Sequence, residues 1–133
     1  MIGDTPYYVL MNKSCRFGPN ILHESTGTHC LPIYGFSNRE TYEAFRTNCA
    51  LMLTPYPLVR RFLQEQIDTA SNGPRLIVLN ATFPDEARVE ATTMEAVLAA
   101  QSSKAAKVAT DYHLVLDLAA SAYRIETAPA VLP

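Results

Sequence analysis

The sequence feature that most limits the fold is a run of four large apolar residues, Leu76–Leu79, which ends at Asn80. No polar residue interrupts the run, so a strand formed here has no face that suits water. Short apolar runs of this kind are typical of strands covered on both faces. The preceding Asn-Gly-Pro at residues 72–74 is a strong helix stop. The sequence therefore predicts a central strand with packed layers on both sides.

Two further strands and one candidate strand precede this run. Residues 7–11 are continuously apolar and follow Pro6, and residues 30–36 include Pro32, which favours a strand start or an edge. Residues 21–24 are a short candidate strand, separated from the next one by a Ser-Thr-Gly-Thr turn. We expect these segments to form one sheet with residues 76–79.

Two amphipathic helices are expected between residues 37 and 70. Ser37 and Glu40 match a capping box, which satisfies two amide donors at a helix start. The first helix would bury an apolar face formed by Tyr42, Phe45, Cys49 and Met52 or Leu53. The second helix begins after the proline-containing segment Thr54–Pro57, which separates the two helices. It would bury Leu58, Val59, Phe62, Leu63, Ile67 and Ala70.

The C-terminal third is Ala-rich and favours helix. After a loop over residues 81–91, Thr92 and Glu95 form a second possible capping box. Apolar residues then recur with helical spacing at Met94, Val97, Leu98, Ala105, Val108, Ala109, Tyr112, Val115, Leu116, Ala119 and Tyr123. Residues 111–118 also alternate like a strand, and that alternative stays open.

These elements predict a mixed α/β (α+β) fold in the order β-β-β-α-α-β-α-α. Its four strands would form one mixed sheet with the helices packed on it. The chain length of 133 residues fits a single domain over residues 1–133, with a core at residues 7–80 and a helical extension at residues 92–124.

Charge and composition restrict the function. The net charge is −2, and no cluster of basic residues exceeds the Arg60-Arg61 pair, which disfavours nucleic-acid binding. The sequence has no run of about 18 apolar residues, so we expect no membrane span. The N-terminal segment does not resemble a signal peptide. We therefore expect a cytoplasmic protein, and its three cysteines, an odd number, do not make a complete disulfide framework.

The first part of the chain shows an ordered pattern of a strand, a Leu-Pro-aliphatic-aromatic strand, an acidic-aromatic helix and an apolar strand ending in Asn. Its residues are Tyr8-Val9-Leu10, Leu31-Pro32-Ile33-Tyr34-Gly35-Phe36-Ser37, Glu40, Tyr42 and Phe45, and Leu76-Ile77-Val78-Leu79-Asn80. Over residues 7–80 this order resembles the SseB N-terminal-like family. That family usually has Pro directly after the Asn, whereas here Ala81 follows and Pro comes at Pro84. The resemblance implies an α/β fold and an accessory role without enzyme chemistry or catalytic residues.

One group of residues has the side chains for metal or thiol chemistry. Cys15, His23, His29 and Cys30 fall within sixteen residues, and thiolate and imidazole are preferred zinc ligands. Their spacing is unlike a zinc knuckle, and His29 and Cys30 would point to opposite faces of a strand. A Cys–His nucleophile pair is the other chemical option, with Arg16 beside Cys15. The alternative is two loop histidines and two partly buried thiols.

The leading hypothesis is a non-enzymatic interaction module that forms a homodimer through its C-terminal region. Charged residues make up 18% of the chain, below the usual value of about 25%, which favours a surface partly covered by another chain. The predicted interface residues are Tyr112, Val115, Leu116 and Tyr123. The alternative is a small thiol- or zinc-dependent protein, and a small-molecule pocket against the first two helices is a third option. We expect no cofactor.

Overall fold

The structure is a computed structural model, and it describes residues 2–21, 32–69 and 75–127. It contains both helices and strands, which confirms the mixed class. The described strands are β1 (Ile2–Asp4), β2 (Tyr8–Asn12), β3 (Cys15–Arg16), β4 (Ile33–Tyr34), β5 (Thr54–Pro57), β6 (Leu76–Leu79), β7 (Arg88–Thr93), β8 (Lys107–Ala109), β9 (Tyr112–Asp117) and β10 (Ala122–Thr127). The described helices are α1 (Arg39–Thr47), α2 (Arg60–Thr69) and α3 (Met94–Ser102).

The strands form three sheets instead of the single four-stranded sheet that we expected. A five-stranded sheet has the order β10-β9-β7-β6-β4, a three-stranded sheet has the order β3-β2-β5, and β1 pairs with β8. The β4–β6 pair is parallel and the other pairs are antiparallel. The crossover from β4 to β6 passes through α1, β5 and α2.

β6 is the covered central strand that the apolar run predicts. All four of its side chains are buried. Leu76 and Val78 belong to one core cluster, while Ile77 and Leu79 belong to another. Each face of this short strand therefore supplies one of the two hydrophobic cores.

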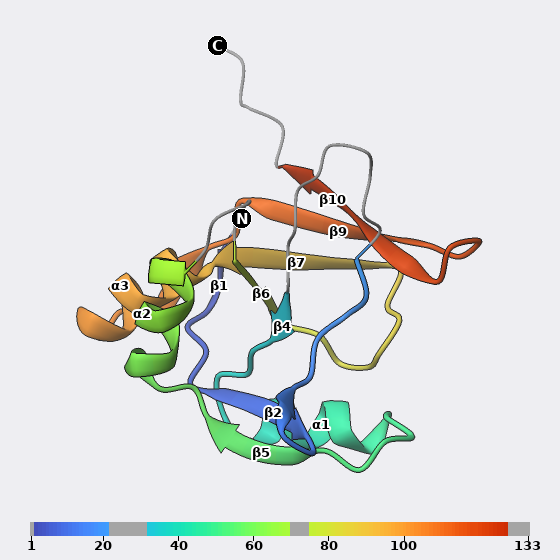
Figure 1. Cartoon of the computed structure of the whole chain (residues 1–133), viewed down its shortest axis with the longest axis horizontal. Helices are drawn as coiled ribbons and strands as arrows, with labels where there is room; N and C mark the ends of the chain where they lie inside the picture. Colours follow the sequence, from blue (N-terminus) through green and yellow to red (C-terminus); the bar gives the residue numbers. More distant parts are fainter. Residues whose placement is uncertain (1, 22–31, 70–74, 128–133) are drawn as a thin grey trace.

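The two cores are covered by different helices (Figure 1). Phe45 of α1 lies in the same cluster as Leu76 and Val78. Leu63 of α2 and Val97 of α3 lie in the cluster on the other side of β6, and α2 contacts α3. Among the helices of the described ranges, none is both long and apolar enough to cross a membrane.

Backbone hydrogen bonds connect the three-stranded and five-stranded sheets. Tyr8 of β2 and Phe36, just after β4, exchange N–H···O bonds of 2.9 Å in both directions. The N–H of Tyr34 donates to the carbonyl of Phe17 at 3.0 Å. The outer side of β4 is thus occupied by the chain that surrounds β2 and β3.

The predicted start of the first helix was wrong by one residue. Asn38, not Ser37, is the N-cap: its Oδ1 accepts from the Thr41 N–H at 3.0 Å, and the Asn38 N–H donates to the Thr41 hydroxyl. α1 ends at Thr47, so Met52 lies beyond it and is 95% exposed. The second capping box shifts likewise, because Thr93 accepts from the Ala96 N–H.

The expected helix over residues 92–124 is confirmed only for α3. The chain leaves the helix at Ser103 and Lys104, where Lys104 has φ 56°, and continues as β8, β9 and β10. The strand alternative for residues 111–118 is therefore correct. Alanine favours helix locally, but pairing of β9 with both β7 and β10 fixes the extended form.

Two segments that we expected to be irregular are strands. Residues 54–57 form β5 in spite of Pro55 and Pro57, because β5 is an edge strand where a missing donor is tolerated. Part of the expected loop over residues 81–91 belongs to β7, where Val89 and Ala91 are buried on one face. The candidate strand at residues 21–24 lies mostly outside the described residues, although Ile21 forms a bridge with Tyr123.

Substitution of Phe45 tests which residue of the first helical segment belongs to the core. Phe45 is fully buried among Phe17, Tyr34 and Phe36, with ring centroids 4.7 to 6.2 Å away. We expect Phe45→Ala to lower the free energy of unfolding by about 3–5 kcal/mol. Met52→Ala, the control, should change it by less than about 0.5 kcal/mol. Urea unfolding followed by circular dichroism measures both, and equal effects would contradict this core assignment.

Candidate functional site

The Cys/His group predicted from the sequence is represented in the structure by Cys15 alone. Cys15 is exposed on β3, and His23, His29 and Cys30 lie outside the described residues. Within the described ranges, no three His, Cys, Asp or Glu side chains are placed to share a metal ion. The zinc and thiol alternatives stay predictions.

Arg16, the basic neighbour of Cys15, packs on an aromatic ring. Its guanidinium carbon lies 3.6 Å from the centroid of the Phe62 ring on α2. A cation over an aromatic face is attracted by the electron density of the ring. The contact connects the β2–β3 hairpin to α2, so Arg16 has a structural role at this position.

The four predicted interface residues all lie in the β9–β10 hairpin, but on two faces. Tyr123 is buried in the core, and Tyr112 and Leu116 pack against the same cluster. Val115 lies on the other face of β9, because side chains alternate along a strand. The apolar residues at helical spacing are therefore largely covered by the chain's own core, not exposed as one stripe.

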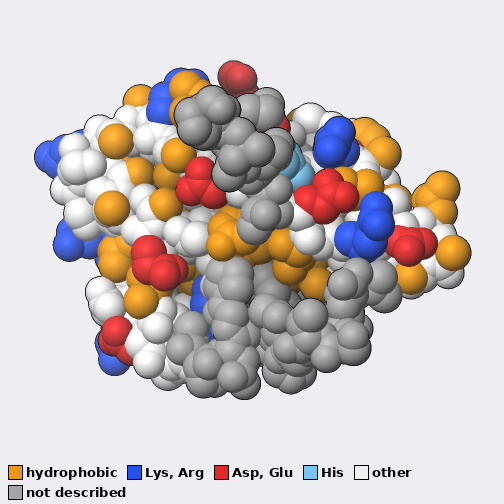
Figure 2. Space-filling model, turned by 90° about the horizontal axis from the view of Figure 1, so that it is seen from above, with side chains coloured by type: hydrophobic (Ala, Val, Ile, Leu, Met, Phe, Trp, Pro, Cys, Tyr) orange, Lys and Arg blue, Asp and Glu red, His pale blue; other side chains and the backbone are white. Residues whose placement is uncertain are grey.

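The outer face of β7, β9 and β10 carries a row of ionisable residues. Glu90, His113 and Glu126 lie directly opposite one another on β7, β9 and β10. The His113 Nδ1 is 4.0 Å from a Glu90 oxygen, and Arg88 and Arg124 each lie 3.8 Å from Glu126. Figure 2 views the molecule from the β10 side, where acidic and basic side chains lie beside the histidine.

The local His113–Asp117 pair that a helix would create is replaced by these cross-strand contacts. Residues four apart are neighbours on a helix, but in β9 the contacts of His113 are set by register. Glu90 is also held by Thr110, whose hydroxyl donates to it at 3.1 Å. The face therefore carries the ion pairs of Arg88 and Arg124 with Glu126, together with the contact between His113 and Glu90.

β10 is an edge strand with outward backbone groups. The Tyr123 N–H donates away from β9, to the carbonyl of Asn20 at 2.8 Å. Backbone direction alternates along a strand, so the N–H and C=O of Ile125 also point away from β9, as do those of Thr127. Within the described ranges, no hydrogen-bond partner is present for the outward groups of Ile125.

The edge at β5 is different, because it has few donors. The backbone groups of Tyr8 and Leu10 form their hydrogen bonds on the side of β2 that faces away from β5. Tyr8 lies opposite Pro57, and Leu10 lies opposite Pro55. In an antiparallel pair, the two residues of such a position both point outward. The outward positions of β5 are therefore prolines without N–H groups, which blocks strand addition there.

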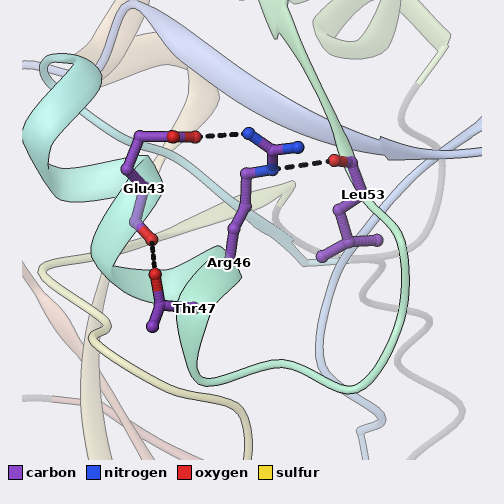
Figure 3. Close-up of polar contacts among 4 residues, drawn as sticks. All are labelled: Glu43, Arg46, Thr47 and Leu53. Carbon is purple, nitrogen blue, oxygen red and sulfur yellow. Dashed lines mark hydrogen bonds and ion pairs between the residues drawn. The ribbon is translucent and has the colours of Figure 1, made fainter.

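A second surface feature is an apolar loop after α1. Leu51 is 48% exposed, and it precedes the almost fully exposed Met52. Figure 3 shows how the loop is held: the Arg46 Nε donates to the Leu53 carbonyl at 2.9 Å, and its Nη1 pairs with Glu43. Arg46 thus fixes the loop to the last turn of α1.

Two buried tyrosines, Tyr34 of β4 and Tyr123 of β10, belong to the same core cluster. The Tyr123 hydroxyl donates to the carbonyl of Glu86 at 2.6 Å. Burial, followed by the charges of Asp85 and Glu86, raises the pKa of Tyr123 to about 12. Burial raises the pKa of Tyr34 further, with smaller contributions from Tyr123, Asp85 and Glu86. Both hydroxyls are therefore held neutral, which makes them poor bases.

A small cavity of about 270 Å³ lies where the parallel strands β4 and β6 end. The carboxyl ends of parallel strands are a common place for ligands. The polar lining includes Asp4 and Glu40 together with Asn80, and none of the described residues that line the cavity is Lys or Arg. The two carboxylates of this lining disfavour an anionic ligand.

Comparisons with family models, with curated proteins and with solved structures found no match to this chain. The functional surface of this chain is therefore inferred from the geometry of its residues. The β10 edge is the feature that sequence reasoning missed. Its signal was the alternation of residues 111–118 followed by Arg124-Ile125-Glu126, in which polar and apolar residues again alternate.

The raised pKa values predict a loss of stability at alkaline pH. Above about pH 10 tyrosines ionise in the unfolded chain, whereas Tyr34 and Tyr123 keep their protons in the folded chain. The unfolded state then binds fewer protons, so the free energy of unfolding falls as the pH rises. Urea unfolding from about pH 9 to about pH 11 measures this. The fall should be smaller in a Tyr34→Phe/Tyr123→Phe variant, while half-exposed Tyr56→Phe is the control; equal slopes would contradict it.

The loop contact predicts a specific effect of Arg46. We expect Arg46→Ala to lower the free energy of unfolding by about 0.5–1.5 kcal/mol, because the half-buried Leu53 carbonyl loses its donor. Arg61→Ala is the control: its Glu65 pair is exposed, so we expect a change below about 0.5 kcal/mol. Chemical denaturation decides, and indistinguishable midpoints for the two variants would show that Arg46 does not hold the loop.

Proposed function

We propose that this chain is a non-enzymatic interaction module that self-associates through its C-terminal hairpin, β9–β10. The observation that carries the proposal is the edge of β10, where the outward N–H and C=O of Ile125 have no partner among the described residues. Unpaired strand edges are templates for another strand. A second copy of the hairpin supplies such a strand.

The support for self-association lies in the backbone of β10 and not in the apolar side chains that the sequence predicted. Tyr112, Leu116 and Tyr123 pack on the chain's own core, so they support the hairpin and do not form the contact themselves. What supports association is backbone pairing at β10. Leu118, which is 83% exposed, lies in the turn between β9 and β10 and not on the β10 edge.

The contrast with β5 also supports the choice of β10. Proline at the outward positions of β5 leaves that edge without donors. β10 carries no proline between Ala122 and Thr127. We therefore place the partner at β10, and we retain within the proposal the accessory role implied by the SseB-like pattern and the cytoplasmic location.

Proline substitution at the edge tests self-association. We expect native protein to show a concentration-dependent monomer–dimer equilibrium in sedimentation velocity at micromolar concentrations. Ile125→Pro removes an outward donor without removing a bond of the β9–β10 ladder, so it should shift the equilibrium to monomer. Thr127→Pro is a second variant with the same expected effect, because its amide also points outward.

Leu118→Ser is the matched control, since it alters the exposed hairpin tip and leaves the edge intact. Circular dichroism confirms that each variant keeps its strands. A dimer lost in both proline variants and kept in Leu118→Ser supports the proposal. A native chain that is monomeric over the whole range overturns it, as does a dimer that only Leu118→Ser disrupts.

A further inference from the structure

We propose that two copies pair β10 against β10 in antiparallel orientation, about a two-fold axis at Ile125. This inference rests on the proposed self-association and specifies its register. The two five-stranded sheets would then join into one continuous sheet across the axis. Closed two-fold contacts of this kind use the same surface on both copies.

Backbone direction limits the possible registers. Tyr123, Ile125 and Thr127 have outward groups, whereas Arg124 and Glu126 bond to β9. Hydrogen-bonded pairs between copies must therefore join outward residues. Ile125 can lie opposite itself, opposite Tyr123 or opposite Thr127, and each choice is a different two-fold arrangement.

The charges beside Ile125 select among these registers. With Ile125 opposite itself, Arg124 lies opposite Glu126 of the partner subunit, and the reverse contact forms by symmetry. If Ile125 lies opposite Tyr123 of the partner subunit, Arg124 lies opposite Arg124 of the partner subunit. If Ile125 lies opposite Thr127 of the partner subunit, Glu126 lies opposite Glu126 of the partner subunit. Like charges directly opposite are destabilising and unlike charges stabilise, so the central register is favoured.

The side chains are available for these contacts. Arg124 and Glu126 are 50% and 44% exposed, and both lie on the outer face of β10. Their present ion pairs are long: Arg124 and Arg88 each lie 3.8 Å from Glu126. In the proposed pair the two positions are non-hydrogen-bonded neighbours, where side chains of opposed strands lie closest.

The pairing competes with one contact within the chain. Asn20 now accepts the Tyr123 N–H, and Ile21 forms a parallel bridge with Tyr123. In the central register this position lies opposite Thr127 of the partner subunit. The partner strand therefore takes over the Tyr123 donor, and the exchange lowers the affinity relative to a wholly unpaired edge.

Charge reversal tests the register by sedimentation velocity at low salt. We expect Arg124→Glu and Glu126→Arg each to raise the dimer dissociation constant by roughly tenfold or more, since two like-charge contacts replace two unlike ones. The double variant restores both contacts and should return close to the native value. A mixture of the two single variants should associate more tightly than either one alone.

Arg88→Glu is the control, because Arg88 contacts Glu126 from β7 and not from the edge. It should leave the dissociation constant within about threefold of native. Native dimers that no charge reversal affects, or single variants that the double variant fails to rescue, overturn the register while self-association stands. A native chain that stays monomeric overturns the proposed function together with the register.

Discussion

Burial of β6 on both faces is the constraint on which the rest of the fold depends. Leu76 and Val78 face the aromatic cluster around Phe45, while Ile77 and Leu79 face α2 and α3. A strand with no solvated face needs a layer on each side, and it needs neighbours on both edges to satisfy its backbone. β4 and β7 supply those neighbours. The helices, the second sheet and the C-terminal hairpin are arranged around that requirement.

The parts of the fold that follow from local patterns were predictable. The apolar run at β6, the strand β2 and the helix containing Phe45 have sequence signals within a few residues of themselves. The C-terminal strands do not: alanine favours helix over residues 105–120, and the strand form depends on partners in β7 that are themselves distant in sequence. The helix cap moved by one residue because Ser37 and Asn38 are both good capping residues, and backbone geometry decides between them.

The sequence predicted residues of the β9–β10 hairpin, but it did not predict the β10 edge that forms the candidate site. The interface residues chosen by helical spacing all fall in one hairpin, although Tyr123 faces inward and Val115 outward. Which backbone groups of Ile125 point outward depends on the register with β9 and on the bond from Tyr123 to Asn20. Neither is encoded in a local pattern. The pKa increases of Tyr34 and Tyr123 likewise arise from burial by segments far apart in the chain.

The edges of the two larger sheets have a consequence for uncontrolled polymerisation. Fibre growth by strand addition requires each subunit to offer two unsatisfied edges, one for the subunit before it and one for the subunit after it. At the far end of the five-stranded sheet, the Tyr34 amide on β4 is already bonded to Phe17. The prolines of β5 leave the neighbouring sheet equally unable to recruit a strand along that side. Among the described residues, pairing through β10 would therefore join two copies without leaving β4 or β5 open to a further strand.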